Sequence, residues 1–221
     1  MRVILAFLLT VNIIFANQKE MEVSDPLSGY NRVMTSINMA FYDYIMYPIS
    51  YSYDYIMPDP IQGAISNFFD NLLYPMRLVN NLFQGKFEAS WVETKRFFIN
   101  TTIGFAGFSD AATLHFDIPK HSEDFGQTLA VWGVPSGAYI VWPIIGPSNL
   151  RDTVGLVADY FSDPLSYIED DWTAFGVKAG RTINEDSLNP GAFSKEAKTN
   201  PDPYIFIRDS YIKKRNYEIS K

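Results

Sequence analysis

The chain has 221 residues, a net charge of −7 and no cysteine. This acidic balance argues against nucleic acid, which needs a basic surface, and against purely electrostatic docking on anionic lipid. Without cysteine the chain can form no disulfide and has no thiol to carry an acyl anchor. Aromatic residues make up 16% of the chain and charged residues only 19%. Rings in this excess favour a membrane-interface protein, although a large aromatic core with a partner surface has the same composition.

The first 16 residues have the order of a secretory signal peptide. Arg2 is followed by an apolar run that ends at Phe15, and Ala16 precedes a polar stretch. The run is shorter than the ~20 residues that span a bilayer, so we expect export and cleavage after Ala16. An uncleaved anchor helix is the alternative. Residues 17–24 are then a linker.

Apolar residues at three- and four-residue spacing predict amphipathic helices along the first half of the mature chain. Pro48 marks the end or a kink of the first helix. Asp59 followed by Pro60 has the pattern of an N-cap and first-turn proline. The predicted helices lie at 27–45, 59–72, 76–83 and 87–103.

Residues 104–147 are rich in glycine and proline and lack the helical spacing of the preceding segments. Two short runs of β-branched and aromatic residues, 128–132 and 138–142, flank a turn signal at 135–137. This pattern predicts a Gly/Pro-rich loop or a short hairpin around residues 125–147. The segment is too long and too apolar for an idle connection, so we expect it to be packed or functional.

Helical spacing resumes after Ser148 and continues almost to the end of the chain. Asp202 before Pro203 predicts a second capped helix start, and the basic run 213–215 suits the last turns of that helix. These helices are predicted at 150–161, 172–183 and from 203 onward. The whole pattern indicates a mainly α, single-domain protein over residues 25–215, with a C-terminal tail at 216–221.

No constellation for catalysis or metal binding is evident. His115 and His121 have no zinc-like spacing, and the acidic run 169–171 lacks the alternating ligands of a calcium loop. We interpret the histidines as surface residues and the acids as a solvated helix start. Nucleotide-binding and hydrolase motifs are also absent from the sequence. We therefore expect a protein that is not an enzyme and has no cofactor or metal.

Five blocks, in order, resemble one known family. The first is Asp-Pro-Leu-Ser-Gly-Tyr-Asn-Arg at 25–32, and the longest runs from Phe125 to Asp152. The others lie at 66–85, 96–110 and 202–211. Together they resemble the VacJ/MlaA family over about residues 25–215. Each block alone is weak, but the ordered set at compatible spacing is specific.

The resemblance implies a ring-like body of amphipathic helices in the inner leaflet of a Gram-negative outer membrane. A central amphipathic channel would remove phospholipid that has strayed into the outer leaflet and pass it to a periplasmic lipid carrier. Association with a trimeric porin is also implied. The alternatives are a structural adaptor that tethers porins without lipid transfer, and an enzyme acting on lipid, for which no nucleophile–base pair is apparent. Family members are commonly lipoproteins, and this cysteine-free chain departs from that pattern.

The longest block also gives the predicted lipid-path residues. Glycine lets a backbone approach an acyl chain closely, and proline stiffens a lip. The alternative is that these residues only shape a loop and that the neighbouring Arg and Asp pair structurally. The predicted path residues are Gly133, Gly137, Tyr139, Pro143, Gly146, Pro147, Arg151 and Asp152; the predicted capping residues are Asp25, Asn31, Arg32, Asp59 and Asp202.

Overall fold

The computed structural model describes residues 25–221, so the predicted signal peptide and linker lie outside the described residues. The fold is mainly helical with one two-stranded hairpin. In chain order the elements are α2 (Ser28–Phe41), the π-helical turn η1 (Tyr42–Met46), α3 (Tyr47–Ile56), α4 (Asp59–Leu72), α5 (Tyr74–Phe83), α6 (Phe87–Thr102), α7 (Ala111–Phe116), α8 (Phe125–Val131), β1 (Tyr139–Trp142), β2 (Gly146–Asn149), α9 (Leu150–Tyr160), the 3-10 turn η2 (Pro164–Tyr167), α10 (Asp171–Ser187), α11 (Ala192–Thr199) and α12 (Pro203–Ile219).

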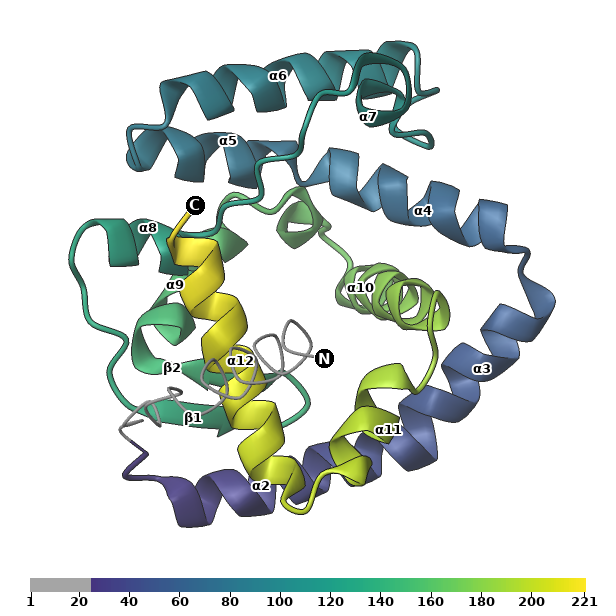
Figure 1. The fold of residues 1–221 in the computed structure, drawn as a ribbon. Coiled ribbons are helices and arrows are strands. Elements are labelled where there is room, and N and C mark those ends of the chain that lie inside the picture. The colour runs from purple at the N-terminus through teal and green to yellow at the C-terminus, as the bar shows by residue number, and fades with distance from the viewer. Residues whose placement is uncertain (1–24) are drawn as a thin grey trace, which may run out of the picture.

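The helices follow a ring (Figure 1). Helices α2, α3 and α4 form successive sides, α5 and α6 close the next side, and α8, α9 and the hairpin complete the circuit. Helix α12 crosses the hairpin, and α10 lies inside the ring against α3 and α4. This arrangement confirms the prediction of a mainly α, ring-like single domain.

Prolines set the corners of the ring. Pro48 lies at the second position of α3, directly after the π-helical turn that joins it to α2. A proline inside a regular helix loses one hydrogen bond and meets the carbonyl four residues earlier, and the wider π turn relieves that conflict. The chain therefore kinks at Pro48 and continues to Ile56. Pro75 likewise lies in the first turn of α5, just after α4 has ended at Leu72.

Of two predicted capping residues that precede a proline, Asp202 caps its helix and Asp59 does not. Asp202 caps α12, accepting hydrogen bonds from the backbone of Tyr204 and Ile205. Asp59 is not a cap, because the Pro58 carbonyl already accepts the first helical hydrogen bonds and Asp59 lies inside α4. There its charge still suits the helix N-terminus.

The three residues predicted to cap α2 instead fasten it to other elements. Leu27 occupies the cap position without a side-chain hydrogen bond. Asp25 accepts hydrogen bonds from the hydroxyl of Tyr204 and the amide of Asn31. Arg32 forms an exposed ion pair with Asp202, 2.8 Å from Nη1 to Oδ2. Asp25 and Arg32 therefore join the start of α2 to α12, whereas Asn31 bonds to Asp25 and to the hairpin.

The hairpin exists, but one element later than the sequence suggested. Residues 128–131 belong to α8, because Asp124 and Gln127 form a capping box that starts a helix there. Strand β1 pairs antiparallel with β2, Tyr139 opposite Asn149 and Trp142 opposite Gly146. The turn therefore lies at 143–145 and not at 135–137.

Asn31 serves the free edge of β1 as a third strand would. Its amide donates to the carbonyl of Tyr139 at 3.0 Å, and its Oδ1 accepts from the backbone N–H of Val141 at 2.9 Å. Because Asn31 is fully buried, these bonds satisfy backbone groups that water cannot reach. Helix α2 thus holds the hairpin from one side while α12 packs on it through Tyr204 and Tyr211.

The distribution of polar and apolar side chains is unusual. Much of the described interior is polar, with Asn31, Gln62, Asn80 and Glu93 among its largest fully buried side chains. By contrast, large apolar side chains are more than four-fifths exposed on several helices and loops. They are Tyr44, Tyr55, Phe105 and Trp172. Within residues 25–221 no helix combines the length and apolarity needed to cross a bilayer.

Candidate functional site

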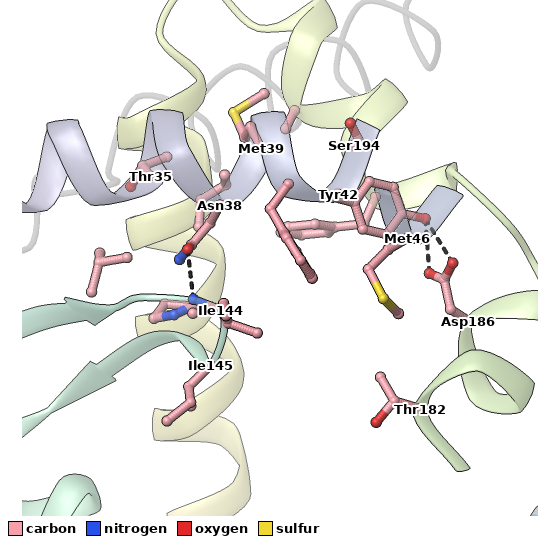
Figure 2. A pocket seen from close by; sticks show the side chains of 17 residues that line it. Thr35, Asn38, Met39, Tyr42, Met46, Ile144, Ile145, Thr182, Asp186 and Ser194 are labelled. Atoms are coloured by element: carbon pink, nitrogen blue, oxygen red, sulfur yellow. Dashed lines mark hydrogen bonds between the residues drawn. The ribbon is translucent and has the colours of Figure 1, made fainter. Parts of the chain in front are cut away.

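An apolar cavity of about 340 Å³ lies between α2, the hairpin turn, α10 and α11 (Figure 2). We call it the apolar chamber. Met39 and Met46, flexible side chains that adapt to irregular ligands, contribute to its wall. The wall is otherwise formed by Thr35, Asn38, Phe41, Tyr42, Val141, Ile144, Ile145, Gly146, Pro147, Thr182, Asp186, Phe193, Ser194, Ala197 and Ile207.

Two polar side chains hold the walls of this chamber in place. Asn38 accepts a hydrogen bond from the backbone N–H of Ile144 at 2.8 Å and donates to the carbonyl of Trp142 at 2.8 Å. Figure 2 shows the first of these bonds across the chamber wall. The hairpin turn is therefore fixed to α2 by a single amide.

Tyr42 does the same on the opposite wall. Its hydroxyl donates to the carboxylate of Asp186 at 2.8 Å and accepts from the backbone N–H of Gly191 at 2.8 Å. Burial and the Asp186 carboxylate raise the pKa of Tyr42 to about 12. The hydroxyl therefore stays protonated and keeps the π-helical turn bound to α10 and α11.

A second cavity, of about 520 Å³, adjoins the first at the hairpin turn, since Ile145 and Pro147 line both. We call it the charged chamber. Its wall includes four aspartates and two arginines, in contrast to the apolar chamber. Its residues are Leu73, Met76, Asp124, Ile145, Pro147, Ser148, Asp152, Leu156, Asp159, Tyr160, Asp163, Arg181, Tyr211 and Arg215.

Arg215 and Asp152 anchor the wall of the charged chamber. Arg215 binds Asp124 through both terminal nitrogens at 2.6 Å and Asp152 through Nε at 2.8 Å. Burial opposes the charge of Asp152, but hydrogen bonds from Arg215, Tyr211 and Arg151 outweigh it and hold its pKa below the usual range. The Asp152 carboxylate is therefore ionised at neutral pH, and both of its oxygens accept hydrogen bonds from neighbouring side chains.

Asp159 differs from its neighbours in the same wall. It accepts hydrogen bonds from the backbone N–H of Phe125 and the amide of Asn80, and forms no ion pair with any described residue. Burial raises its pKa to about 6, against the effect of these hydrogen bonds, and the nearby charge of Asp124 adds to the rise. A carboxylate without a cation partner thus faces the chamber.

A third cavity, of about 470 Å³, opens beside the apolar chamber, with Tyr42 and Ser194 in the walls of both. We call it the outer groove. Lys195 and Lys198 lie on its α11 side, and Lys198 pairs with Asp43 at 2.6 Å. The three cavities therefore follow one another in the order outer groove, apolar chamber, charged chamber.

This series of cavities suits an amphipathic molecule. Acyl chains gain free energy on entering an apolar space, and a zwitterionic headgroup needs charged partners when it leaves water. Within residues 25–221 no group of carboxylates or histidines is arranged to hold a metal ion, and His115 is exposed at the end of α7. The adjoining cavities can therefore accommodate both the apolar and the charged part of such a molecule.

Sequence comparison with known proteins shows which family this chain belongs to. A family model described as "MlaA lipoprotein" matches residues 23–218. The chain belongs to the MlaA lipoprotein family. It is 33% identical over 203 residues to the "Intermembrane phospholipid transport system lipoprotein MlaA" of Escherichia coli K12, covering 88% of this chain and 78% of that protein. The Haemophilus influenzae protein of the same name is 30% identical, with 90% and 80% covered.

A solved structure has a similar fold to this chain. It is described as "Structural basis for maintenance of bacterial outer membrane lipid asymmetry" and superposes with a TM-score of 0.73 at 30% identity. The match covers 89% of this chain and 99% of that one. The resemblance drawn from five sequence blocks is therefore confirmed, and the ring is a fold of the MlaA family.

The predicted lipid-path residues divide into two groups in this MlaA-family chain. Gly146 and Pro147 line the apolar chamber, and Pro147 and Asp152 line the charged chamber. The remaining predicted residues line none of the three described cavities. They are Gly133, Gly137, Tyr139, Pro143 and Arg151.

Three of the five residues outside the cavities contact other parts of the fold, whereas Gly133 and Pro143 are exposed. Tyr139 is buried against Tyr204 and Tyr211, and Arg151 is buried beside Asp152, with 2.9 Å from Nε to Oδ1. Gly137 has a φ of +69° and lies against Leu150, where a side chain would be strained. The Arg151–Asp152 pair matches the structural alternative considered for the sequence.

Several residues of the cavities were missed from sequence. Ile144 and Ile145 are not among the predicted path residues, although two adjacent isoleucines between a proline and a glycine stand out in the sequence. In the structure both are exposed at the hairpin turn. Arg215 was assigned to a basic tail at a helix end. In the structure α12 continues to Ile219, and Arg215 reaches across to Asp124 and Asp152.

Proposed function

We propose that this protein moves phospholipid between the bacterial membranes, removing misplaced lipid from the outer leaflet of the outer membrane and so maintaining lipid asymmetry. The lipid passes through the apolar and charged chambers. The adjoining walls of these chambers carry the proposal, because Ile145 and Pro147 belong to both, so the apolar and charged cavities meet at the hairpin turn. The names of the relatives support the same process. We assign the protein no catalytic step.

Exposed apolar side chains supply the membrane contact in this proposal. The relatives are named lipoproteins, whereas this chain has no cysteine for an acyl thioether. At ~25 cal/mol per Å², several hundred Å² of apolar side chain inserted in a leaflet is worth roughly 10 kcal/mol. Tyr44, Tyr55, Phe105 and Trp172 are the most exposed candidates for such insertion. The body would rest in the inner leaflet of the outer membrane, with its periplasmic face in water.

Two partners complete the proposal. A trimeric porin would hold the ring at the outer membrane, and a soluble periplasmic lipid carrier would receive the phospholipid. The exposed apolar helix faces suit contact with another membrane protein as well as with lipid. The same faces favour the competing function, an adaptor that tethers porins without transferring lipid.

Ile145→Lys tests the transport proposal against the adaptor. Ile145 is 68% exposed and lies at the boundary of both chambers, so a lysine there puts a charge in the path without disturbing buried packing. We expect a strain with this variant as its only copy to accumulate outer-leaflet phospholipid and become detergent-sensitive, as a deletion strain would. Phospholipid that co-purifies with the variant should fall severalfold.

Leu114→Lys is the matched control. Leu114 is 69% exposed on α7, lines none of the three cavities, and receives the same charge. It should restore leaflet asymmetry as wild type does. Full restoration by Ile145→Lys, together with porin binding and no lipid in the purified wild-type protein, would favour the adaptor.

A further inference from the structure

The two arginines of the charged chamber are not equally available to a ligand. Arg215 has an 11% exposed side chain, and Asp124, Asp152 and Glu218 occupy its nitrogens. Arg181 has a 25% exposed side chain and uses Nε for Glu185 at 2.7 Å. Among the described residues, no protein partner binds the terminal nitrogens of Arg181. One guanidinium edge therefore remains for an acceptor such as phosphate.

The carboxylates are also unequal, and two of them have no cation. Asp124 pairs with Arg215, and Asp152 pairs with both Arg215 and Arg151. Asp159 and Asp163 bind only backbone N–H groups and the Asn80 amide, and in the described part of the chain neither forms an ion pair. Two negative charges therefore remain for a cation in the same cavity.

One aromatic ring in the wall of the charged chamber already lies beside an ammonium group. Lys178 Nζ lies 5.2 Å from the centre of the Tyr160 ring, and Tyr160 lines the chamber. An ammonium over an aromatic face is favourable, so this ring is part of a surface that accepts cations. Glu185 and Glu218, which pair with the two arginines, leave the surroundings acidic overall.

We propose that the charged chamber selects phospholipids whose headgroup carries an ammonium, such as phosphatidylethanolamine, over anionic lipids such as phosphatidylglycerol. The proposal rests on the transport function proposed above. The phosphate binds the open edge of Arg181, the ammonium pairs with Asp159 and Asp163, and the acyl chains occupy the apolar chamber.

An anionic headgroup fits this cavity poorly. Phosphatidylglycerol offers the phosphate but only neutral hydroxyls beyond it, so Asp159 and Asp163 stay without a cation. Its negative charge also meets the surplus of carboxylates. Burial raises the pKa of Asp159 to about 6, and a ligand that brings positive charge stabilises the ionised form of this carboxylate, which phosphatidylglycerol cannot do.

Lipid competition on the full-length protein tests the proposal. The protein in detergent is equilibrated with equimolar phosphatidylethanolamine and phosphatidylglycerol of identical acyl chains, and bound lipid is measured by native mass spectrometry at pH 7.5. We expect phosphatidylethanolamine to exceed phosphatidylglycerol about fivefold, the discrimination that one partly exposed ion pair supplies. Phosphatidylcholine, which keeps the positive charge, should compete against phosphatidylglycerol equally well.

The double variant Asp159→Asn, Asp163→Asn should bind as much total lipid but at a ratio near one. Asn keeps an oxygen acceptor for the backbone groups that both aspartates bind, so the fold is retained. Asp117→Asn removes one charge at the exposed end of α7 and should leave the ratio unchanged.

Three outcomes would overturn the inference. Equal binding of the two lipids by wild type, or a preference for phosphatidylglycerol, rejects headgroup selection while leaving lipid transport standing. An unchanged ratio of bound phosphatidylethanolamine to phosphatidylglycerol in the double variant rejects the role of Asp159 and Asp163 in headgroup selection. Wild-type protein that binds no lipid at all rejects both this inference and the proposed function.

Discussion

Two of the buried ion networks in residues 25–221 have similar chemistry and different surroundings. The closed network joins α5, α6 and α7: Glu93, fully buried, binds Arg77 at 2.6 Å, and Arg96 binds Asp110 at 2.8 Å. The open network joins Arg215 to Asp124 and Asp152 in the wall of the charged chamber. The closed network borders a cavity of about 20 Å³, room for about one water molecule, whereas the open one borders about 520 Å³.

The comparison teaches that available space, more than residue type, separates a structural ion network from a binding site. Both networks use aspartate or glutamate with arginine, and both have hydrogen-bonded partners on several helices. Only the open one faces a volume that a headgroup could enter. Variants in the closed network should therefore act on stability, and variants in the open network on stability and lipid together.

Glu93→Gln should give the largest effect. It leaves the buried Arg77 without a counter-charge, while Arg96 keeps Asp110, so we expect the free energy of unfolding to fall by about 3–5 kcal/mol. Urea unfolding followed by circular dichroism measures it. Glu88→Gln, an exposed acid on the same helix, should cost far less. Equal losses in the two variants would mean that the closed network contributes nothing.

Asp152→Asn should destabilise the fold less, by roughly 2 kcal/mol, because Arg215 keeps Asp124 and Glu218 and the new amide oxygen can still accept a hydrogen bond from the buried Arg151. The pKa of Asp152 is lowered in the fold, so its contribution is present at neutral pH and is lost as pH falls below its usual range near 4. Wild type should therefore lose more stability than the variant on acidification below pH 4. Thermal unfolding across that range measures the difference, and parallel curves would contradict it.

Asp159→Asn should change the stability of the fold less than Asp152→Asn does, and it should raise the stability rather than lower it. The pKa of Asp159 is raised to about 6, so its protonated form suits the fold, and the group reduces stability as pH rises from about 4 to above 6. The variant lacks this loss. We expect its melting temperature to exceed that of wild type by a few degrees at pH 7.5 and to match it at pH 4. A lower melting temperature at pH 7.5 would show that the hydrogen bonds of the charged form dominate.

Lys120→Ala should have the smallest effect and so marks the edge of the closed network. Lys120 pairs with Asp70 at 2.7 Å, but the two side chains are 35% and 50% exposed. An exposed ion pair contributes about 0–1 kcal/mol because water and salt screen it. A urea midpoint within error of wild type is expected. A loss close to that of Glu93→Gln would extend the closed network to the surface.

The sequence predicted the helices well because their signals are local. Apolar spacing and proline positions need only neighbouring residues, and they placed most helices from α2 to α12 within a few positions. Helix α3 had no predicted counterpart, because Pro48 was interpreted as the end or a kink of the helix before it. The short helices α7 and α11 were missed, since six and eight residues give too little periodicity. Residues 128–132 were misread because the β-branched and aromatic run outweighed the Asp124 capping signal.

The candidate site was harder to predict because its contacts are distant in sequence. Asn38 meets Ile144, Tyr42 meets Asp186, and Arg215 meets Asp124 across roughly a hundred residues or more. Nothing near Arg215 in the chain reveals this pairing. The ordered family blocks pointed to the 125–152 segment, which supplies Gly146, Pro147 and Asp152, but gave no way to separate cavity residues from packed ones.

The methionines of the apolar chamber make one end of the proposed path sensitive to oxidants. Oxidation of Met39 or Met46 would replace a flexible thioether with a polar sulfoxide in a wall that otherwise favours hydrocarbon. The charged chamber has Met76 in its wall but already offers water and charge, so the same modification would change its character little. Oxidative stress would therefore impair acyl-chain entry before it impaired headgroup binding, and a methionine sulfoxide reductase would restore the chamber without new protein synthesis.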